Sequence, residues 1–203
     1  FWMGASFRNA TAERANFSGQ DFQYTYGGID FSSADLDGAN FSGAHLESAD
    51  FSNASLIGAD LTNLHYGSDE WGNSLSSSID FSDAQMMSAD LSGSRFSSGT
   101  SFSSADLTDA KFVDATVRSS MASVDANSAD FTSADLTGVD FSSANLGNAN
   151  FYSANLHGAD FHNASLTSAD LSYLDFGTDA DGEDILGSID FSFAQMMSAD
   201  LSG

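Results

Sequence analysis

Carboxylate side chains are dense near the C-terminal end of this 203-residue sequence. The segment GTDADGED carries Asp179, Asp181, Glu183 and Asp184 beside glycines. Carboxylate oxygens in a tight loop are the ligands that Ca²⁺ prefers, so the segment predicts a calcium loop. Its Gly182 comes too early for an EF-hand, and no Glu stands at the twelfth place. A solvated corner loop is the alternative, and calcium is the one cofactor that the sequence suggests.

The sequence indicates no catalytic site. It contains no Cys, which excludes a disulfide framework, a thiolate nucleophile and thiolate metal ligands. Ser is so abundant that its presence is uninformative, and no Ser, His and Asp set recurs in a pattern typical of a nucleophile. Gly-rich phosphate-binding loops and basic stripes are absent from the sequence as well. We therefore predict that the protein is not an enzyme.

The charge restricts the partners. The chain has 29 Asp and Glu against 5 Lys and Arg, a formal net charge of −24. Such a surface repels the phosphates of nucleic acids and of anionic lipids, so we expect neither as a partner. No apolar run approaches the ~20 residues of a membrane span, so no membrane insertion is expected. Divalent cations and proteins with basic surfaces remain as possible partners. Separately, the 41% hydrophobic content predicts that the chain is ordered.

The element that positions these residues is an internal repeat with a period of five. From Phe31 to Leu61 a large apolar residue stands at every fifth place, and Ala precedes most of these by two places. A period of five fits neither a helix nor a strand. Three alternating residues form a minimal strand, and two small polar residues then turn the chain. Because one unit cannot bury its own apolar residue, stacked coils must form the core.

These units, of the form A(D/N)LXX, resemble the pentapeptide repeat family over nearly the whole chain. The resemblance implies an all-β fold, a right-handed quadrilateral β-helix with four pentapeptides in each coil. It also implies that the central Leu or Phe and the preceding Ala point inward. The expected core includes Phe31, Leu36, Phe41, Leu46, Phe51, Leu56, Phe81, Met86, Phe141, Leu146, Phe151, Leu156, Phe191 and Met196. Met86 and Met196 come from the repeated segment AQMMSADLSG, in which we interpret the first Met as core and the second as surface.

A longer duplication overlies the pentapeptides. Residues 29–93 align without gaps to residues 139–203, with 40 identities in 65 pairs, so the tandem unit has a length of 110 in the numbering. The motif degrades at 62–80 and 172–190 and resumes in phase, which we interpret as one irregular coil each. Residues 1–203 then form a single solenoid of about ten coils, each of twenty residues. At this coil length the offset of 110 amounts to 5.5 coils, so equivalent positions such as Trp71 and Asp181 should lie on opposite faces.

The same coil length predicts columns of stacked carboxylates. The first acidic column is Asp30, Asp50, Glu70 and Asp90, and its counterpart is Asp140, Asp160 and Asp200. Carboxylates ~4.8 Å apart repel each other by about 1 kcal/mol in water, so their charges need compensation. One interpretation is that each carboxylate accepts hydrogen bonds from backbone amides at the corners. The other is that divalent cations bind along the columns.

Two functional classes follow. The first is a non-catalytic structural solenoid, a rigid acidic scaffold that belongs to a longer array or stacks end to end into filaments. Neither end of the sequence shows a cap, so exposed coil edges are expected to self-associate. The alternative is a DNA mimic, since the resemblance includes family members that occupy the DNA-binding saddle of type II topoisomerases. The low Lys content and the Ser richness favour an extracellular or cell-surface location over others.

Overall fold

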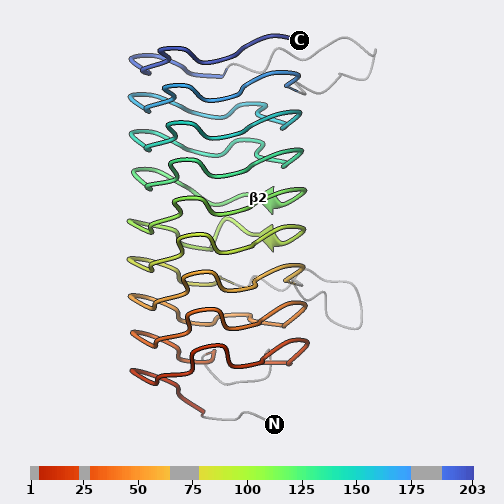
Figure 1. The fold of residues 1–203 in the computed structure, drawn as a ribbon, viewed down its shortest axis with the longest axis vertical. Helices are drawn as coiled ribbons and strands as arrows, with labels where there is room; N and C mark the ends of the chain where they lie inside the picture. Colours follow the sequence, from red (N-terminus) through yellow and green to blue (C-terminus); the bar gives the residue numbers. More distant parts are fainter. Residues whose placement is uncertain (1–4, 23–27, 65–77, 175–188) are drawn as a thin grey trace.

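A computed structural model describes residues 5–22, 28–64, 78–174 and 189–203. The described chain winds into a stack of flat coils, a quadrilateral β-helix (Figure 1). The only strands longer than one residue in these ranges are β1 (Arg95–Phe96) and β2 (Thr116–Val117), which pair in parallel. Elsewhere the described coils pair through single-residue parallel bridges, and no helix occurs in them. The predicted all-β solenoid is confirmed.

The coil shape follows from each five-residue unit. In the unit around Phe31, the Ala34 N–H donates to the Phe31 carbonyl at 3.0 Å, which closes a four-residue turn. Ser33, the third residue of this turn, has φ 56°, and a positive φ at this place alone is typical of a type II turn. The flanking Asp30 pairs in parallel with Asp50 of the next coil. Each unit is thus one short side of the coil followed by one corner.

The central residues of the units fill the axis of the coil. Twelve of the fourteen expected core residues are 0–1% exposed, including Met86. The other two, Phe191 and Met196, lie in the last rung and are only partly buried. The aromatic rings stack from coil to coil, and the rings of Phe131 and Phe151 lie 4.9 Å apart at 6°. This ring stacking along the axis ties each rung to the next one.

The sequence predicts coils of twenty residues throughout, but the coil length varies in the structure. One ladder of bridges runs unbroken through nine rungs, whose members are Thr11, Asp35, Ser55, Gln85, Asp106, Asp125, Asn145, Ser165 and Gln195. In the numbering, the steps between successive members are 24, 20, 30, 21, 19, 20, 20 and 30. The irregular segments 62–80 and 172–190 each fall within a step of thirty. Each of these steps exceeds a twenty-residue coil by ten residues, so each irregular segment holds a ten-residue addition to a coil and is not a separate coil.

This spacing corrects the expected relation between the two copies. Asp35 and Asn145, which differ by one tandem unit in the numbering, lie on the same ladder five rungs apart. The unit therefore spans five whole rungs, an advance of ~24 Å with no half turn. The prediction that equivalent positions lie on opposite faces is wrong. One coil of each unit contains ten additional residues, and the prediction counted these ten residues as half a coil. Trp71 and Asp181, which were to test the prediction, lie outside the described residues.

Candidate functional site

The outward residue just before each central Phe or Leu defines the surface. In the described chain this position is mostly Asp or Asn, and its side chain bonds back to the following corner. The six described members of the predicted acidic columns, Asp30, Asp50, Asp90, Asp140, Asp160 and Asp200, all accept a hydrogen bond at Oδ1 from the backbone N–H two residues on, at 2.8–3.0 Å. Such a bond fixes the turn and gives the carboxylate a structural role.

The composition of the predicted columns is wrong. Asp30 and Asp50 pair in sequence with Asp80, whereas Asp90 pairs with Asp60 on a different face. In the second copy Asp160 pairs with Asp190, whereas Asp200 pairs with Asp170. The cause is again the ten-residue addition, which moves every later residue by two sides of the coil. Glu70 lies outside the described residues.

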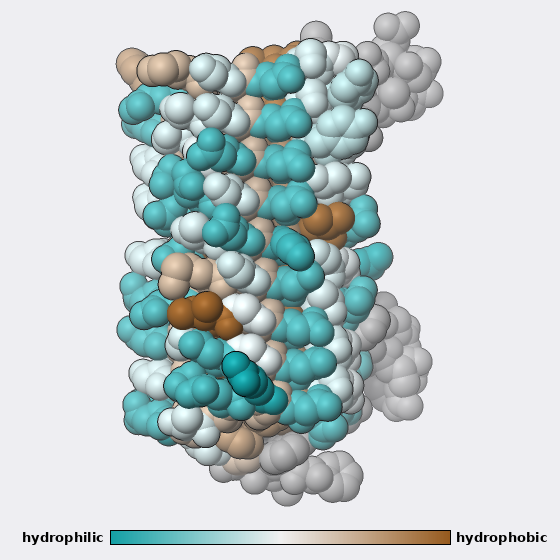
Figure 2. All heavy atoms as spheres, in the orientation of Figure 1, coloured by the Kyte–Doolittle hydropathy of each residue, from teal (hydrophilic) through white to brown (hydrophobic). Residues whose placement is uncertain are grey.

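Polar side chains do stack in columns along the rod, as the hydrophilic stripe in Figure 2 shows. In the described chain, two aspartates form an ion pair with an arginine. Burial raises the pKa of Asp30, but hydrogen bonds from Ser32 and from the Arg8 guanidinium outweigh it and lower the pKa to about 2. Arg8 Nε lies 3.1 Å from Asp30 Oδ2. Burial likewise raises the pKa of Asp135, and the Arg118 ion pair and hydrogen bonds from Thr137 lower it below its usual range.

No metal centre forms in the described ranges. They contain no group of three His, Asp or Glu side chains arranged to hold an ion. The calcium-loop residues Asp179, Asp181, Glu183 and Asp184 lie outside these ranges, so the calcium hypothesis stays a prediction.

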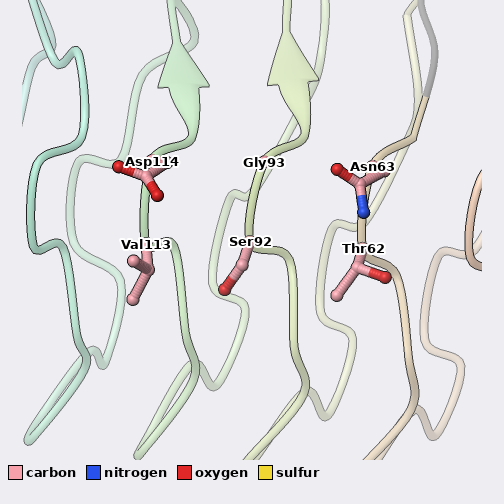
Figure 3. A pocket seen from close by; sticks show the side chains of 6 residues that line it. All are labelled: Thr62, Asn63, Ser92, Gly93, Val113 and Asp114. Atoms are coloured by element: carbon pink, nitrogen blue, oxygen red, sulfur yellow. The ribbon is translucent and has the colours of Figure 1, made fainter.

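A shallow groove of about 560 Å³ crosses three rungs at one corner of the rod (Figure 3). Its residues are Thr62 and Asn63, Ser92 and Gly93, and Val113 and Asp114 from consecutive rungs. The groove is deepest at the middle of these three rungs, where Gly93 has no side chain. A Cβ at Gly93 would lie 2.6 Å from Asn63 Oδ1, so a larger residue there would require the Asn63 side chain to move. The lining contains one carboxylate, Asp114, and the hydroxyl groups of Thr62 and Ser92, with no His, Lys or Arg among its six residues.

Exposed aromatic residues are the surface feature that the sequence analysis missed. Tyr152 and Tyr173, on neighbouring rungs, are 43% and 60% exposed with ring centroids 5.4 Å apart. His162 and Phe193 repeat this arrangement on another face, also at 5.4 Å. The signal was present in the sequence: aromatic rings stand at turn positions where the repeat mostly has Ser, Gly, Asn, Asp or Thr.

Comparison with known proteins agrees with this geometry. The family model for pentapeptide repeats matches residues 28–63, 84–120, 100–142 and 144–177, with eight copies. No curated protein sequence matches the chain significantly. Among the described residues, no helix has the length and hydropathy needed to cross a bilayer.

Two solved structures are similar over most of the chain. One is a trypsin-treated variant of QnrB1, a plasmid-mediated fluoroquinolone resistance protein, at 17% identity and a TM-score of 0.64, covering 94% of this chain and 92% of that chain. The other is HetL, involved in heterocyst differentiation regulation in the cyanobacterium Nostoc sp. strain PCC 7120, at 20% identity and a TM-score of 0.36, covering 96% and 88%. At 17% identity the likeness to QnrB1 concerns the fold alone.

Proposed function

Because the chain belongs to the pentapeptide repeat family, we propose that it is a non-catalytic structural solenoid, a rigid acidic scaffold. The observation that carries this proposal is the whole number of rungs in the tandem unit. Asp35 and its equivalent Asn145 occupy the same ladder. A tandem array of such units presents equivalent surfaces on one face every ~24 Å, which suits a spacer or a display rod.

Rigidity is supported by how each rung is held. Asp50 N–H donates to the Ile29 carbonyl of the preceding rung at 2.9 Å, while Phe51 N–H donates to the Asp80 carbonyl of the following rung at 2.7 Å. The Phe51 ring stacks on Phe31 at 4.9 Å and on Phe81 at 5.3 Å. The same pattern of bonds continues on both sides of the ten-residue additions, so the additions do not interrupt the rod.

The last described rung supports assembly. Leu201 is 59% exposed, whereas its equivalent Leu91 is 0% exposed because the next rung covers it. Met196 is only partly buried, in contrast to the fully buried Met86. A further rung of the same kind would bury these side chains. We propose that it is supplied by continuation of the repeat array or by the end of a second copy.

Two experiments test the scaffold. Adding a further copy of residues 94–203 after Gly203 continues the repeat, and the maximum dimension from small-angle scattering should grow by five rungs per unit, ~24 Å. End stacking should give filaments by negative-stain microscopy at high protein concentration and in ~0.5 M salt, which screens the net charge of −24. Leu201→Asp should remove the filaments. A chain that stays monomeric and whose added unit does not lengthen the rod would contradict the proposal.

A second candidate, the DNA mimic, is favoured by the charge density. The described residues carry 22 Asp and Glu against 5 Lys and Arg, a net charge of −17. Nine rungs at ~4.8 Å give a rod of about 43 Å, so this is about one charge per 2.5 Å. Duplex DNA carries one per roughly 1.7 Å. A mimic should inhibit supercoiling by gyrase, and the absence of inhibition at a large excess would eliminate this candidate.

A further inference from the structure

The exposed apolar surface is concentrated at one end of the rod. All five large hydrophobic side chains that are exposed in the described chain fall between residues 152 and 201, namely Tyr152, Tyr173, Phe193, Met197 and Leu201. Leu201 is explained by the open rung. Tyr152 and Tyr173 stand at turn positions on the side of the rod, and both stay exposed although a described rung follows each of them, as the hydrogen bond from Tyr173 N–H to the Ser202 carbonyl shows for Tyr173. Their exposure therefore needs another explanation.

The backbone makes Tyr173 more unusual. It has φ 54°, in the left-handed region, where a bulky residue is a genuine outlier. The equivalent residue of the first copy is Asn63, which tolerates this region well, and the equivalent of Tyr152 is Ser42. The Tyr173 ring lies over Gly203, since a Cβ at Gly203 would come within 3.0 Å of the ring. An aromatic side chain that is both strained and exposed indicates a functional contact.

The charge around the tyrosines selects the partner. No Lys or Arg follows Arg118 in the sequence. Asp170 precedes Tyr173 on the same rung and pairs with Asp200 on the next one. Both carboxylates use Oδ1 for their own corners, at 2.9 Å from Ser172 N and from Ser202 N. Hydrogen bonds from Ser202 lower the pKa of Asp200, so it stays charged at neutral pH. Anionic partners are repelled from this surface.

We propose that the Tyr152–Tyr173 pair, with Asp170 and Asp200 beside it, is a docking surface for an arginine-bearing protein segment. A guanidinium group can stack on a tyrosine ring and at the same time donate hydrogen bonds to a carboxylate, which an ammonium group does less well. Tyrosine and arginine are also the residues that most often dominate protein interfaces. The surface lies on the side of the rod and includes Asp200 of the last described rung.

The test uses the full chain and a fluorescent five-residue peptide, Arg-Gly-Arg-Gly-Arg with blocked ends, at physiological ionic strength. The matched variant is Tyr152→Ser with Tyr173→Asn, which installs the first-copy residues and keeps the net charge. Since the first copy folds with these residues, the variant should fold, which circular dichroism checks. A second variant, Asp170→Asn, removes one charge and keeps the corner, because Asn150 on the same ladder accepts the equivalent bond from Tyr152 N at 2.9 Å.

We expect the tyrosine variant to bind the peptide about five- to thirtyfold more weakly than the wild type, the loss of two exposed cation–π contacts. Asp170→Asn should also weaken binding of the peptide. The same peptide with citrulline in place of arginine should bind the wild type and the tyrosine variant equally. Equal affinity of wild type and tyrosine variant would overturn the proposal, since general electrostatics would then account for all binding. A neutral oligosaccharide that binds the wild type better than the peptide does would overturn it as well.

Discussion

The register across the ten-residue addition can be tested by a disulfide. The structure pairs Ser55 with Gln85 as direct neighbours, although they are far apart in sequence. Their backbones lie one strand spacing apart, ~4.8 Å, within the range of Cα separations that a disulfide spans. Because the chain has no native Cys, Ser55→Cys with Gln85→Cys should form a single internal disulfide. Closing a loop of about 30 residues should raise the free energy of unfolding by about 3.5 kcal/mol, before any strain of the bond.

The control pair is Ser55→Cys with Asp106→Cys, two rungs apart on the same ladder. Its Cα separation of ~9.6 Å exceeds what a disulfide spans without backbone movement. Mild oxidation followed by mass spectrometry and non-reducing electrophoresis measures bond formation, and urea unfolding with and without reductant measures stabilisation. A disulfide in the control but not in the first pair would show that the rung order is incorrect, and with it the five-rung length of the tandem unit.

Three further predictions concern stability. Phe131→Ala should lower the free energy of unfolding by about 3–5 kcal/mol, and the partly exposed Phe191→Ala by less than half of that; equal losses in urea unfolding would contradict the stacking of the core. The pKa of Asp30 is lowered to about 2, so its contribution is complete above about pH 4 and is lost as the pH falls through 2. In thermal melts, Asp30→Asn should therefore destabilise the protein at pH 7 and much less at pH 2, and a constant difference would argue against the Arg8 pairing. Ser133→Gly should raise the free energy of unfolding by about 0.5 kcal/mol. Ser133 has φ 57°, and the relief of this backbone strain exceeds the entropy that glycine adds to the unfolded chain. A lower free energy of unfolding would show that the corner is unstrained.

Most of the interior could be predicted from the sequence. The period of five placed Phe31 and Met86 on the axis, because a residue that returns at every fifth place occupies the same position on each side of a four-sided coil and so always points toward the axis. Of the two interpretations of the aspartates, the structure tests the first one and confirms it. The hydrogen bond from Ser52 N to Asp50 is local, so the chemistry of the corner predicted it. Cation binding depends on the relative positions of distant carboxylates, which the sequence could not supply.

The aromatic pair shows the same limit. Tyr152 and Tyr173 are visible in the sequence as unusual turn residues, but they are 21 positions apart, and only the stacking of rungs brings their rings to 5.4 Å. No period of five or twenty identifies them as partners.

The sequence by itself determined the repeat, the all-β solenoid and the identity of the buried residues, because each five-residue unit specifies its own side and corner through short-range turns. The tertiary structure decided which rungs are neighbours. A ten-residue addition preserves the phase of five. The pattern of inward residues therefore cannot reveal whether the ten added residues form two further sides of the coil or are extra to it. The parallel pairing of Asp50 with Asp80 resolves this, since backbone hydrogen bonds form only between adjacent rungs. That pairing places both copies of the tandem unit on one face.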